Sequence, residues 1–292
     1  MNVEVICQNK CELGEGPVWD EKRRTIFWLD ILKGLIHEYS IDEKNCTHYV
    51  VGEMIGSFAL TEDGNMVTAT KNGFGMVNRK TGEFKILINP ESDKPNNRFN
   101  DGKCDPAGRF WAGTMSLKGE DEAGSLYIYD GKKVVKKLGN VSISNGIVWT
   151  ADMLKMYYID TPTLEVKGFD YDNSSGEISN SKVIIKIDPK DGYPDGMTID
   201  TEGMLWIAHW GGWQVTRWDP QTGEKISSIS LPAAQITSCT FGGPEMEDLF
   251  ITSAKTGISP EQLENQPLAG SLFVIRKSGF SGYPSNRFTL KI

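Results

Sequence analysis

The chain has 292 residues, a formal net charge of -8 and 24% charged residues. Its basic residues are scattered along the sequence, which argues against a nucleic-acid partner. No run of 18 apolar residues is present, so no membrane-spanning segment is predicted. The 31 glycines and 12 phenylalanines, with short apolar runs split by polar turns, are typical of an all-β protein with a large core.

A short apolar phrase, usually containing an aromatic residue, recurs six times along the chain. Its copies are TIFWLD, NMVTAT, RFWAGT, MYYIDT, LWIAHW and LFITSA, around Trp28, Val67, Trp111, Tyr158, Trp206 and Phe250. A period of about 40 to 50 residues is typical of one supersecondary unit that buries its apolar face by stacking on copies of itself. Because no linker or low-complexity tract interrupts the period, a single domain spanning residues 1–292 is predicted.

Each copy is predicted to be the returning strand of a β-hairpin. The turns carry Asp-Gly, Pro-x-Gly or Thr-Glu-Gly signals, which supply the left-handed backbone positions that hairpins need. In chain order the six hairpins are GPVWDEKRRTIFWLD, SFALTEDGNMVTAT, GKCDPAGRFWAGT, GIVWTADMLKMYYID, GMTIDTEGMLWIAH and CTFGGPEMEDLFIT.

A third apolar strand follows each hairpin, and most units add a weaker fourth strand, such as KILIN at 85–89 and KVIIKI at 182–187. Four antiparallel strands repeated six times predict an all-β, six-bladed β-propeller. The opening VEVIC at 3–7 lies outside the first unit. We expect it to supply the outer strand of the last blade and so to close the ring.

The five cysteines form an odd set without a CxxC pair. Cys7 and Cys11 have no matching second pair to complete a zinc site, so buried or inactive thiols are predicted. The N-terminus has no positively charged segment followed by an apolar one, so no signal peptide is expected. These features predict a reduced, cytoplasmic protein.

The starts of the six first strands are the predicted place for chemistry, because in a propeller these strands line the central channel. The residues there are Glu15, Ile55 with Gly56, Asp101, Asn145, Asp195 and Thr237. Four of these positions are Glu, Asp or Asn followed by glycine. Each dipeptide alone is also a common turn former, so only their convergence on one axis indicates a site.

Up to three carboxylates and one amide around one axis would repel one another unless a proton or a cation intervenes. All the candidate ligand atoms are oxygens, which suits Ca²⁺, Mg²⁺ or Mn²⁺ better than Zn²⁺. Arg98, in NNRFNDGK, is the strong cationic candidate nearby. It could hold a polyhydroxylated or carboxylated ligand, or only pair with an acid.

The three histidines point to no catalytic pair. His37 and His48 are predicted at the surface, whereas His209, in IAHWGGW, could reach the channel mouth. Neither a GxSxG motif nor a Cys/His pairing is present, so a serine or cysteine hydrolase is not expected.

Long stretches of the chain resemble the senescence marker protein (regucalcin), gluconolactonase and luciferin-regenerating enzyme family of six-bladed propellers. The resemblance covers essentially the whole chain, and QVTRWDP and WGG are most similar to bacterial sugar lactonases. The segments that carry it are LGEGPVW at 13–19, NNRFNDGKCDPAGRFWAGTM at 96–115, ISNGI at 143–147, YPDGMTIDTEGMLWIA at 193–208 and TSCTFGGPEMEDLFIT at 237–252, with the later PLAGSLF.

The resemblance implies that Glu15, Asn145 and Asp195 hold one divalent metal ion, with Ca²⁺ as the first choice and Zn²⁺, Mn²⁺ or Mg²⁺ as alternatives. It also implies that Asp195 is the catalytic acid and base, and that Arg98 and Asn100 bind substrate. The neighbouring Asp101 is expected to join them. Lys118 stands where animal regucalcins carry a substrate-contacting Glu, which leaves the sugar open. The roles of Lys118 and His209 at the channel mouth stay open too.

The expected function is therefore a metal-dependent sugar lactone hydrolase, gluconolactonase-like, which opens aldonolactones to aldonic acids. Metal polarisation of the carbonyl and general acid/base catalysis by Asp195 would carry the reaction. The expected partner is a small-molecule sugar lactone, and the expected state a monomer or weak homo-oligomer. Two alternatives stay open: a calcium-binding regulatory or scaffold protein of the regucalcin type without significant catalysis, and hydrolysis of organophosphates or aryl esters at the same metal centre.

Overall fold

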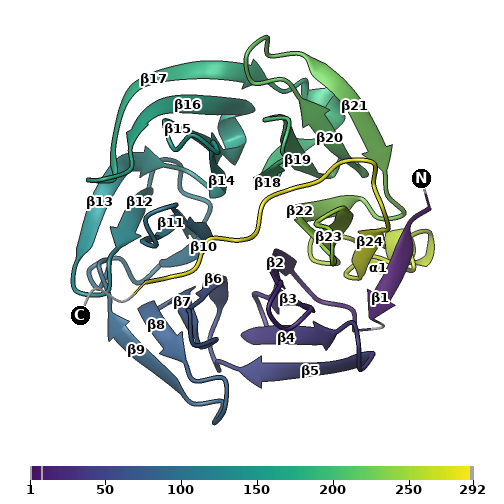
Figure 1. The fold of residues 1–292 in the computed structure, drawn as a ribbon, viewed down its shortest axis with the longest axis horizontal. Helices are drawn as coiled ribbons and strands as arrows, with labels where there is room; N and C mark the ends of the chain where they lie inside the picture. The colour runs from purple at the N-terminus through teal and green to yellow at the C-terminus, as the bar shows by residue number, and fades with distance from the viewer. Residues whose placement is uncertain (1, 8, 290–292) are drawn as a thin grey trace.

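The computed structural model describes residues 2–7 and 9–289, which form an all-β fold of antiparallel sheets arranged around a common centre (Figure 1). The first sheet contains β2 (Gly14–Asp20), β3 (Thr25–Asp30), β4 (Leu35–Ser40) and β5 (Asn45–Val50). The second contains β6 (Ile55–Leu60), β7 (Met66–Thr70), β8 (Gly73–Val77) and β9 (Phe84–Ile88).

The third and fourth sheets repeat this four-stranded plan. The third contains β10 (Asn97–Cys104), β11 (Phe110–Ser116), β12 (Gly124–Tyr129) and β13 (Val134–Val141). The fourth contains β14 (Ser144–Trp149), β15 (Lys155–Asp160), β16 (Glu165–Asp172) and β17 (Glu177–Lys186). Two 3-10 turns follow strands of the fourth sheet: η1 (Thr161–Thr163) after β15 and η2 (Pro189–Asp191) after β17.

The remaining eight strands form one sheet, because a single bridge between Trp210 and Gln235 joins two groups of four. The first group contains β18 (Tyr193–Ile199), β19 (Leu205–Trp210), β20 (Gln214–Trp218) and β21 (Lys225–Ser230). The second contains β22 (Gln235–Gly242), β23 (Asp248–Ala254), β24 (Leu272–Ile275) and β1 (Glu4–Cys7), with helix α1 (Pro260–Glu264) between β23 and β24. The N-terminal strand β1 pairs antiparallel with β24, as the sequence predicts.

Burial explains the recurrent aromatic phrase. In the first sheet, the second strand β3 is buried at every position, whereas the outer strand β5 is mostly exposed. Six hydrophobic clusters each join two successive groups of four strands, and the last cluster joins β23 and β24 to β2 and β3. The core therefore lies between sheets, and a second strand must be apolar on both faces.

His37 corrects one prediction. It lies in β4, the third strand of its sheet, where its ring stacks on Trp28 with centroids 5.0 Å apart. It is buried, and burial lowers the pKa of His37 to about 4. The surface position predicted for it is wrong, because its ring stacks on Trp28 of the adjacent strand in the same sheet. His48, in β5, is exposed as predicted.

Buried aspartates brace the first and second strands of two sheets. Asp105 accepts hydrogen bonds from Trp111 Nε1 at 2.8 Å and from Arg109 Nε at 2.6 Å. Asp200 accepts equivalent bonds from Trp206 Nε1 at 2.9 Å and from Arg217 Nε at 2.8 Å. Each carboxylate is thus paired and hydrogen-bonded, which burial of a charge requires.

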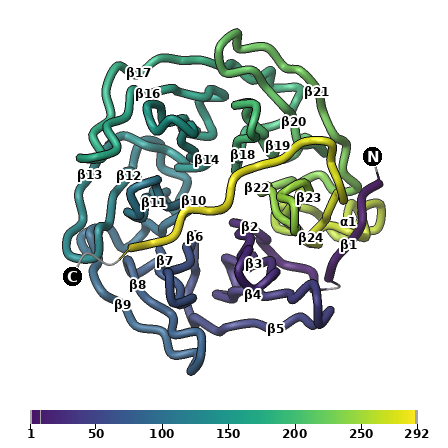
Figure 2. Tube along the Cα trace, viewed as in Figure 1, coloured from purple at the N-terminus to yellow at the C-terminus, as the bar shows by residue number. Residues whose placement is uncertain are grey.

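The C-terminal segment 281–289 crosses the centre of the molecule, a feature that the repeat does not predict (Figures 1 and 2). It bridges Asp200 through Gly282 and Thr61 through Phe288, and the backbone N–H of Thr289 donates to Gly108 O. One end of the central space is therefore covered by the chain itself. Among residues 2–7 and 9–289, no helix has the length and apolarity that crossing a membrane requires.

Candidate functional site

The predicted axis residues lie inside the first strands, at β-bulges. The strand pairing is interrupted between Glu15 and Val18 in β2, between Phe99 and Gly102 in β10, between Ser144 and Ile147 in β14, and between Pro194 and Met197 in β18. A bulge bends a strand and redirects its side chains, and bulges often adjoin active sites. Two of these bulges require glycine after the polar residue. Gly16 has a left-handed backbone with φ +51°, and a Cβ on Gly146 would clash with Met197 Cγ at 2.7 Å.

Arg98 and Asn100 form a buried pair on β10. Arg98 Nη1 donates to Asn100 Oδ1 at 2.7 Å and to Phe99 O at 2.9 Å. The Asn100 amide in turn donates through Nδ2 to Ser144 O at 2.8 Å and to Asn145 Oδ1 at 3.3 Å. Three of the predicted residues, from two strands, therefore belong to one hydrogen-bond network.

Asn145 is tied to the strand that carries Asp195. Its Nδ2 donates to Thr161 Oγ1 at 2.7 Å, and that hydroxyl donates to Pro194 O at 2.8 Å. Because Nδ2 is held by Thr161, the amide oxygen of Asn145 faces the Asn100 side. This is the atom through which Asn can bind a hard cation.

Glu15 and Asp195 form a strongly destabilised carboxylate pair. Burial, followed by the charge of Asp101, raises the pKa of Glu15 to about 8. Burial, followed by the charges of Glu15 and Asp101, raises the pKa of Asp195 well above its ordinary value. Burial also lowers the pKa of Arg98 to about 10, although Glu15 and Asp195 oppose that shift. The single positive charge of Arg98 therefore cannot compensate both Glu15 and Asp195 when these two carboxyl groups are ionised.

These residues meet the chemical requirements of a cation site. Asp195 Oδ1 is buried and has no hydrogen-bond partner among the described residues. A divalent cation would satisfy this oxygen and remove the repulsion between Glu15 and Asp195. No group of three or more His, Cys, Asp or Glu side chains placed to hold a metal occurs in residues 2–7 and 9–289. The predicted ligand set contains only two such side chains, Glu15 and Asp195, and its third member is the amide of Asn145.

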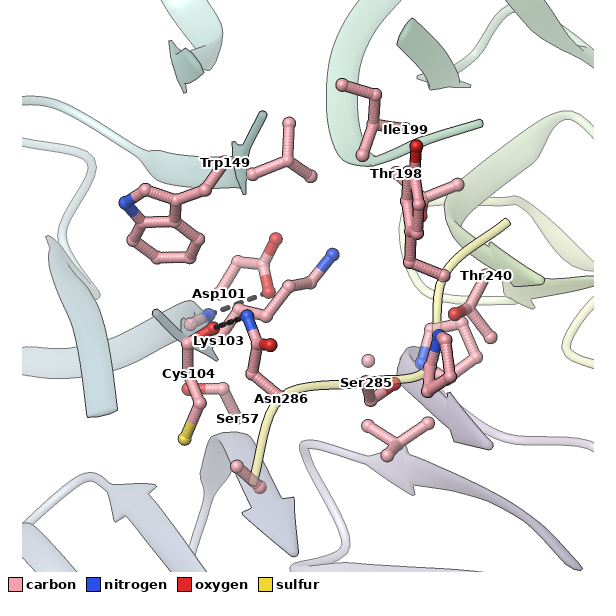
Figure 3. A pocket seen from close by; sticks show the side chains of 18 of the residues that line it. Ser57, Asp101, Lys103, Cys104, Trp149, Thr198, Ile199, Thr240, Ser285 and Asn286 are labelled. Carbon is pink, nitrogen blue, oxygen red and sulfur yellow. Dashed lines mark hydrogen bonds between the residues drawn. The ribbon is translucent and has the colours of Figure 1, made fainter. Parts of the chain in front are cut away.

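Asp101 lies on the other side of this cluster, in a cavity of about 350 Å³ (Figure 3). Figure 3 shows the Lys103 side chain reaching into the cavity beside Asp101, and Lys103 Nζ donates to Met197 O at 3.0 Å. Burial raises the pKa of Asp101, and Lys103 opposes this shift. The C-terminal residues 283–286 line the far end of the cavity. Of the six predicted site residues, Asp101 alone lines it, so Asp101 separates the cluster from the covered end of the channel.

Lys118 and His209 differ in their surroundings. Lys118 is exposed in the loop after β11, where its backbone N–H donates to Ser116 Oγ at 3.1 Å. His209 is fully buried, with Nε2 2.6 Å from Thr216 Oγ1 on β20, and burial lowers its pKa to about 4. Because its imidazole is fully buried and held by Thr216, His209 does not reach an accessible surface at the channel mouth.

Comparison with known proteins identifies the family. A family model described as SMP-30/Gluconolactonase/LRE-like region matches residues 13–255, which include Glu15, Arg98, Asn100, Asn145 and Asp195. The chain belongs to this family. Regucalcin from Xenopus laevis is 38% identical over 294 residues, covering 99% of this chain and 98% of that protein. A Bacillus subtilis (strain 168) protein whose name proposes a sugar lactone lactonase, YvrE, is 38% identical over 275 residues and covers 94% of each chain.

Two solved structures are similar to this SMP-30/gluconolactonase/LRE-like chain over its whole length. The luciferin-regenerating enzyme superimposes with a TM-score of 0.93 at 31% identity, covering 99% of both chains. The calcium-binding protein regucalcin from Agrobacterium tumefaciens str. C58 superimposes with a TM-score of 0.94 at 30% identity, covering 98% of this chain and 97% of that one.

Two groups that hold the site of this SMP-30/gluconolactonase/LRE-like protein carry no sequence signal. Ser144 contributes only its backbone carbonyl, which any residue could supply. Thr161 follows the MYYID strand and forms η1, and a lone threonine after a strand is not a recognisable motif. The position could have been suspected only because the second strand of a hairpin returns to the end where the first strand begins.

Proposed function

We propose that this protein is a metal-dependent sugar lactone hydrolase that opens aldonolactones to aldonic acids. The observation that carries the proposal is the buried Glu15–Asp195 pair, with Asp195 Oδ1 unpaired among the described residues, beside the Arg98–Asn100 pair. Membership of the SMP-30/gluconolactonase/LRE-like family supports it, as does the sugar lactone lactonase name of the Bacillus subtilis relative.

The proposal includes a closed six-bladed propeller as the scaffold, with β1 completing the last blade. Contacts between first strands support a ring, since β2 contacts β6, β6 contacts β10, and the series continues through β14, β18 and β22 back to β2. In such a ring the bulges of four first strands bring their side chains to one axis.

Glu15, Asn145 and Asp195 are the residues that we propose as ligands of one divalent cation, Ca²⁺ first, with Zn²⁺, Mn²⁺ or Mg²⁺ as alternatives. When bound, such a cation supplies Lewis acidity to the lactone carbonyl and compensates the negative charge that develops on its oxygen. Thr161 fixes the Asn145 amide in the orientation that ligation through Oδ1 needs.

Asp195 is the proposed acid and base. A carboxylate that binds a cation through one oxygen keeps its second oxygen free to hold a proton. The carboxylate accepts a proton from water as the water oxygen forms a bond to the carbonyl carbon. It returns that proton to the ring oxygen as the ring carbon–oxygen bond breaks, so the product is an open hydroxy acid. Arg98 donates to the sugar hydroxyls, and Asn100 fixes its guanidinium.

The test is a metal-titrated lactone screen of the full chain. After chelation, Ca²⁺, Mn²⁺, Zn²⁺ or Mg²⁺ is added, and the opening of gluconolactone, xylonolactone and arabinonolactone is followed by acid release. We expect at least one lactone to open faster than in buffer with metal, and Asp195→Asn to abolish the acceleration. Exposed Asp42→Asn is the control. Acceleration of none by any metal would overturn the proposal, and an active Asp195→Asn variant would reassign the base.

The same screen tests the alternatives. Several relatives are named regucalcin, and one similar solved structure is of a calcium-binding protein. Calcium binding by calorimetry without turnover of any lactone would favour a calcium-binding regulator or scaffold. Turnover of aryl esters or organophosphates in preference to every lactone would favour the other hydrolase. The proposal further includes a cytoplasmic location, because all five cysteines are free. It also includes a monomer or weak homo-oligomer as the state of the protein.

A further inference from the structure

A second pocket, of about 260 Å³, lies between the β18–β21 group and the group that contains β22. No charged side chain lines it, although 24% of the residues in the chain are charged. Its lining instead combines one tryptophan with four amide side chains: Trp213, Ala234, Gln235, Gly257, Ile258, Gln262, Asn265 and Gln266. An uncharged pocket of this kind suits an uncharged, polyhydroxylated ligand.

The pocket lies at the same end of the strands as the proposed catalytic site. Gln235 begins β22 and is bridged to Trp210, which pairs with Tyr193, two residues before Asp195. Trp210 also packs on the cluster that contains Leu13. A Cβ on Gly257 would lie 3.7 Å from the Trp210 indole. Trp210 therefore lies between Tyr193 of β18 and the pocket residues Gln235 and Gly257.

Trp213 is held in an unfavourable backbone conformation with its indole exposed. Its φ is +58°, which a bulky residue rarely adopts, and 42% of its surface is accessible. The conformation is maintained because the backbone N–H of Trp213 donates to Ala234 O at 3.2 Å and its carbonyl accepts from Leu231 N at 2.7 Å. The Trp213 indole is therefore partly exposed at the pocket that it lines.

The amides present their donors to the pocket. Gln262 Oε1 accepts from Ser259 N at 3.0 Å, and Gln266 Oε1 accepts from Ala234 N at 2.7 Å. These bonds fix both amides and leave their NH₂ groups for a ligand. Gln235 is only 9% exposed, and its Oε1 has no partner among the described residues. A hydroxyl group, which both donates and accepts, would complement this set.

We propose that this pocket is a subsite for an uncharged sugar unit attached to the lactone, so that the substrate class is a glycosylated aldonolactone. The inference rests on the proposed lactone hydrolysis. One face of the sugar ring would lie on the Trp213 indole, and its hydroxyls would bind the amides of Gln235, Gln262 and Gln266. The lactone end would occupy the site of Arg98 and Asp195, with Trp210 between the two sites.

Steady-state kinetics test the subsite by comparing kcat/KM for glycosylated and simple lactones. The kcat/KM of cellobionolactone, maltobionolactone and their trisaccharide homologues is divided by that of gluconolactone. We expect a ratio of about ten or more for at least one glycosylated lactone, and Trp213→Gly to lower it about tenfold. Gln235→Met should lower it as well without disturbing the fold, since Gln235 Oε1 has no partner among the described residues. A ratio near one in the unmodified protein overturns the proposal.

Lys44→Gly is the matched control. Lys44 also has a positive φ, +52°, and is exposed, but it lies in the turn between β4 and β5 and lines neither pocket. Because glycine relaxes the backbone in both variants, loss of the ratio in Trp213→Gly alone assigns the effect to the indole. Equal ratios in the two variants contradict the proposal.

Calorimetry with cellobiose, maltose and their aldonates separates this inference from the proposed function. Sugar binding that Trp213→Gly removes supports the subsite even when no lactone is opened. Lactone hydrolysis without sugar binding, and with no preference for glycosylated lactones, sinks the subsite while the proposed function stands. Binding of sugars that Trp213→Gly leaves unchanged places them elsewhere and also contradicts the proposal.

Discussion

Arg98 and Asn100 lie two residues apart on β10, and Arg98 Nη1 donates a 2.7 Å hydrogen bond to Asn100 Oδ1. Because the same Asn100 amide donates to Ser144 O and to Asn145 Oδ1, the guanidinium and the amide of Asn145 are oriented by one side chain. Asn100 thus orients both the substrate-binding residue Arg98 and the cation-binding residue Asn145 of the proposed site.

Replacing Asn100 by Leu should therefore damage both halves. We expect kcat/KM on the preferred lactone to fall about 10- to 100-fold, because Arg98 loses its acceptor and Asn145 loses a donor. Steady-state kinetics with saturating metal measure the change. Asn286→Leu, which removes a 3.2 Å bond to Cys104 O at the covered end of the channel, is the control. An Asn100→Leu enzyme with unchanged kcat/KM would show that this coupling has no catalytic role.

Thr161 is predicted to act through Asn145. Thr161→Val keeps the shape but removes the hydroxyl that accepts from Asn145 Nδ2 and donates to Pro194 O. Cation affinity measured by calorimetry should fall about 10- to 100-fold, as expected when a group that orients a ligand is lost. Thr161→Ser, which keeps the hydroxyl, should restore most of the affinity. Equal affinities in the Val and Ser variants would reject this role.

The carboxylates predict an unusual pH dependence of stability without metal. The pKa of Glu15 is raised to about 8 in the folded protein, so the folded state holds its proton more tightly than the unfolded state does. This contribution to stability is complete below the ordinary pKa of a Glu and is lost as the pH rises to about 8. Thermal unfolding in chelator should therefore give a Tm that falls over this range.

Added Ca²⁺ should raise the Tm more at pH 8 than at pH 5, since a cation binds the ionised carboxylates. Glu15→Gln should flatten much of the Tm decrease seen in chelator, while Asp195 retains a part of it. A Tm in chelator that rises steadily from pH 5 to pH 8 would contradict the arrangement of these carboxylates.

The hydrogen bonds of buried Asp105 are expected to contribute strongly to the free energy of unfolding. Asp105→Ala leaves Arg109 without its carboxylate and Trp111 Nε1 without its acceptor, so the free energy of unfolding should fall by about 3–5 kcal/mol. Urea denaturation measures the loss. Asp42→Ala removes an exposed ion pair with Arg24 and should cost less than about 1 kcal/mol. Similar losses in the two variants would show that the brace contributes no more than a surface pair.

Sequence reasoning selected Glu15, Asn145 and Asp195 because the aromatic phrase measures the distance back to each first strand. It placed them at the starts of the strands, whereas the structure places them within strands at bulges. A bulge is a local loss of pairing, and hairpin periodicity does not show where pairing is lost. The Asp-Gly dipeptide at Asp101 resembles that at Asp195, yet only Asp101 lines the cavity with Lys103.

The groups that could not be predicted are those whose role depends on packing. His37 is buried and stacks on Trp28 of its own sheet, and His209 is held by Thr216 of the next strand. Their sequence surroundings are compatible with surface positions. Trp213 is another case, since nothing in WGGW shows that its backbone has a positive φ.

The pairing of β1 with β24 has a consequence for synthesis of the chain. Residues 4–7 are synthesised long before their partner residues 272–275. Hairpins within each sheet can form early from neighbouring residues, whereas this pair must close nearly the entire chain into a loop. Until then, β1 has no partner strand and the apolar side chains of the first sheet that cover Phe250 and Leu272 remain open. Before β24 is synthesised, the nascent chain therefore carries an unpaired strand that favours association with other chains.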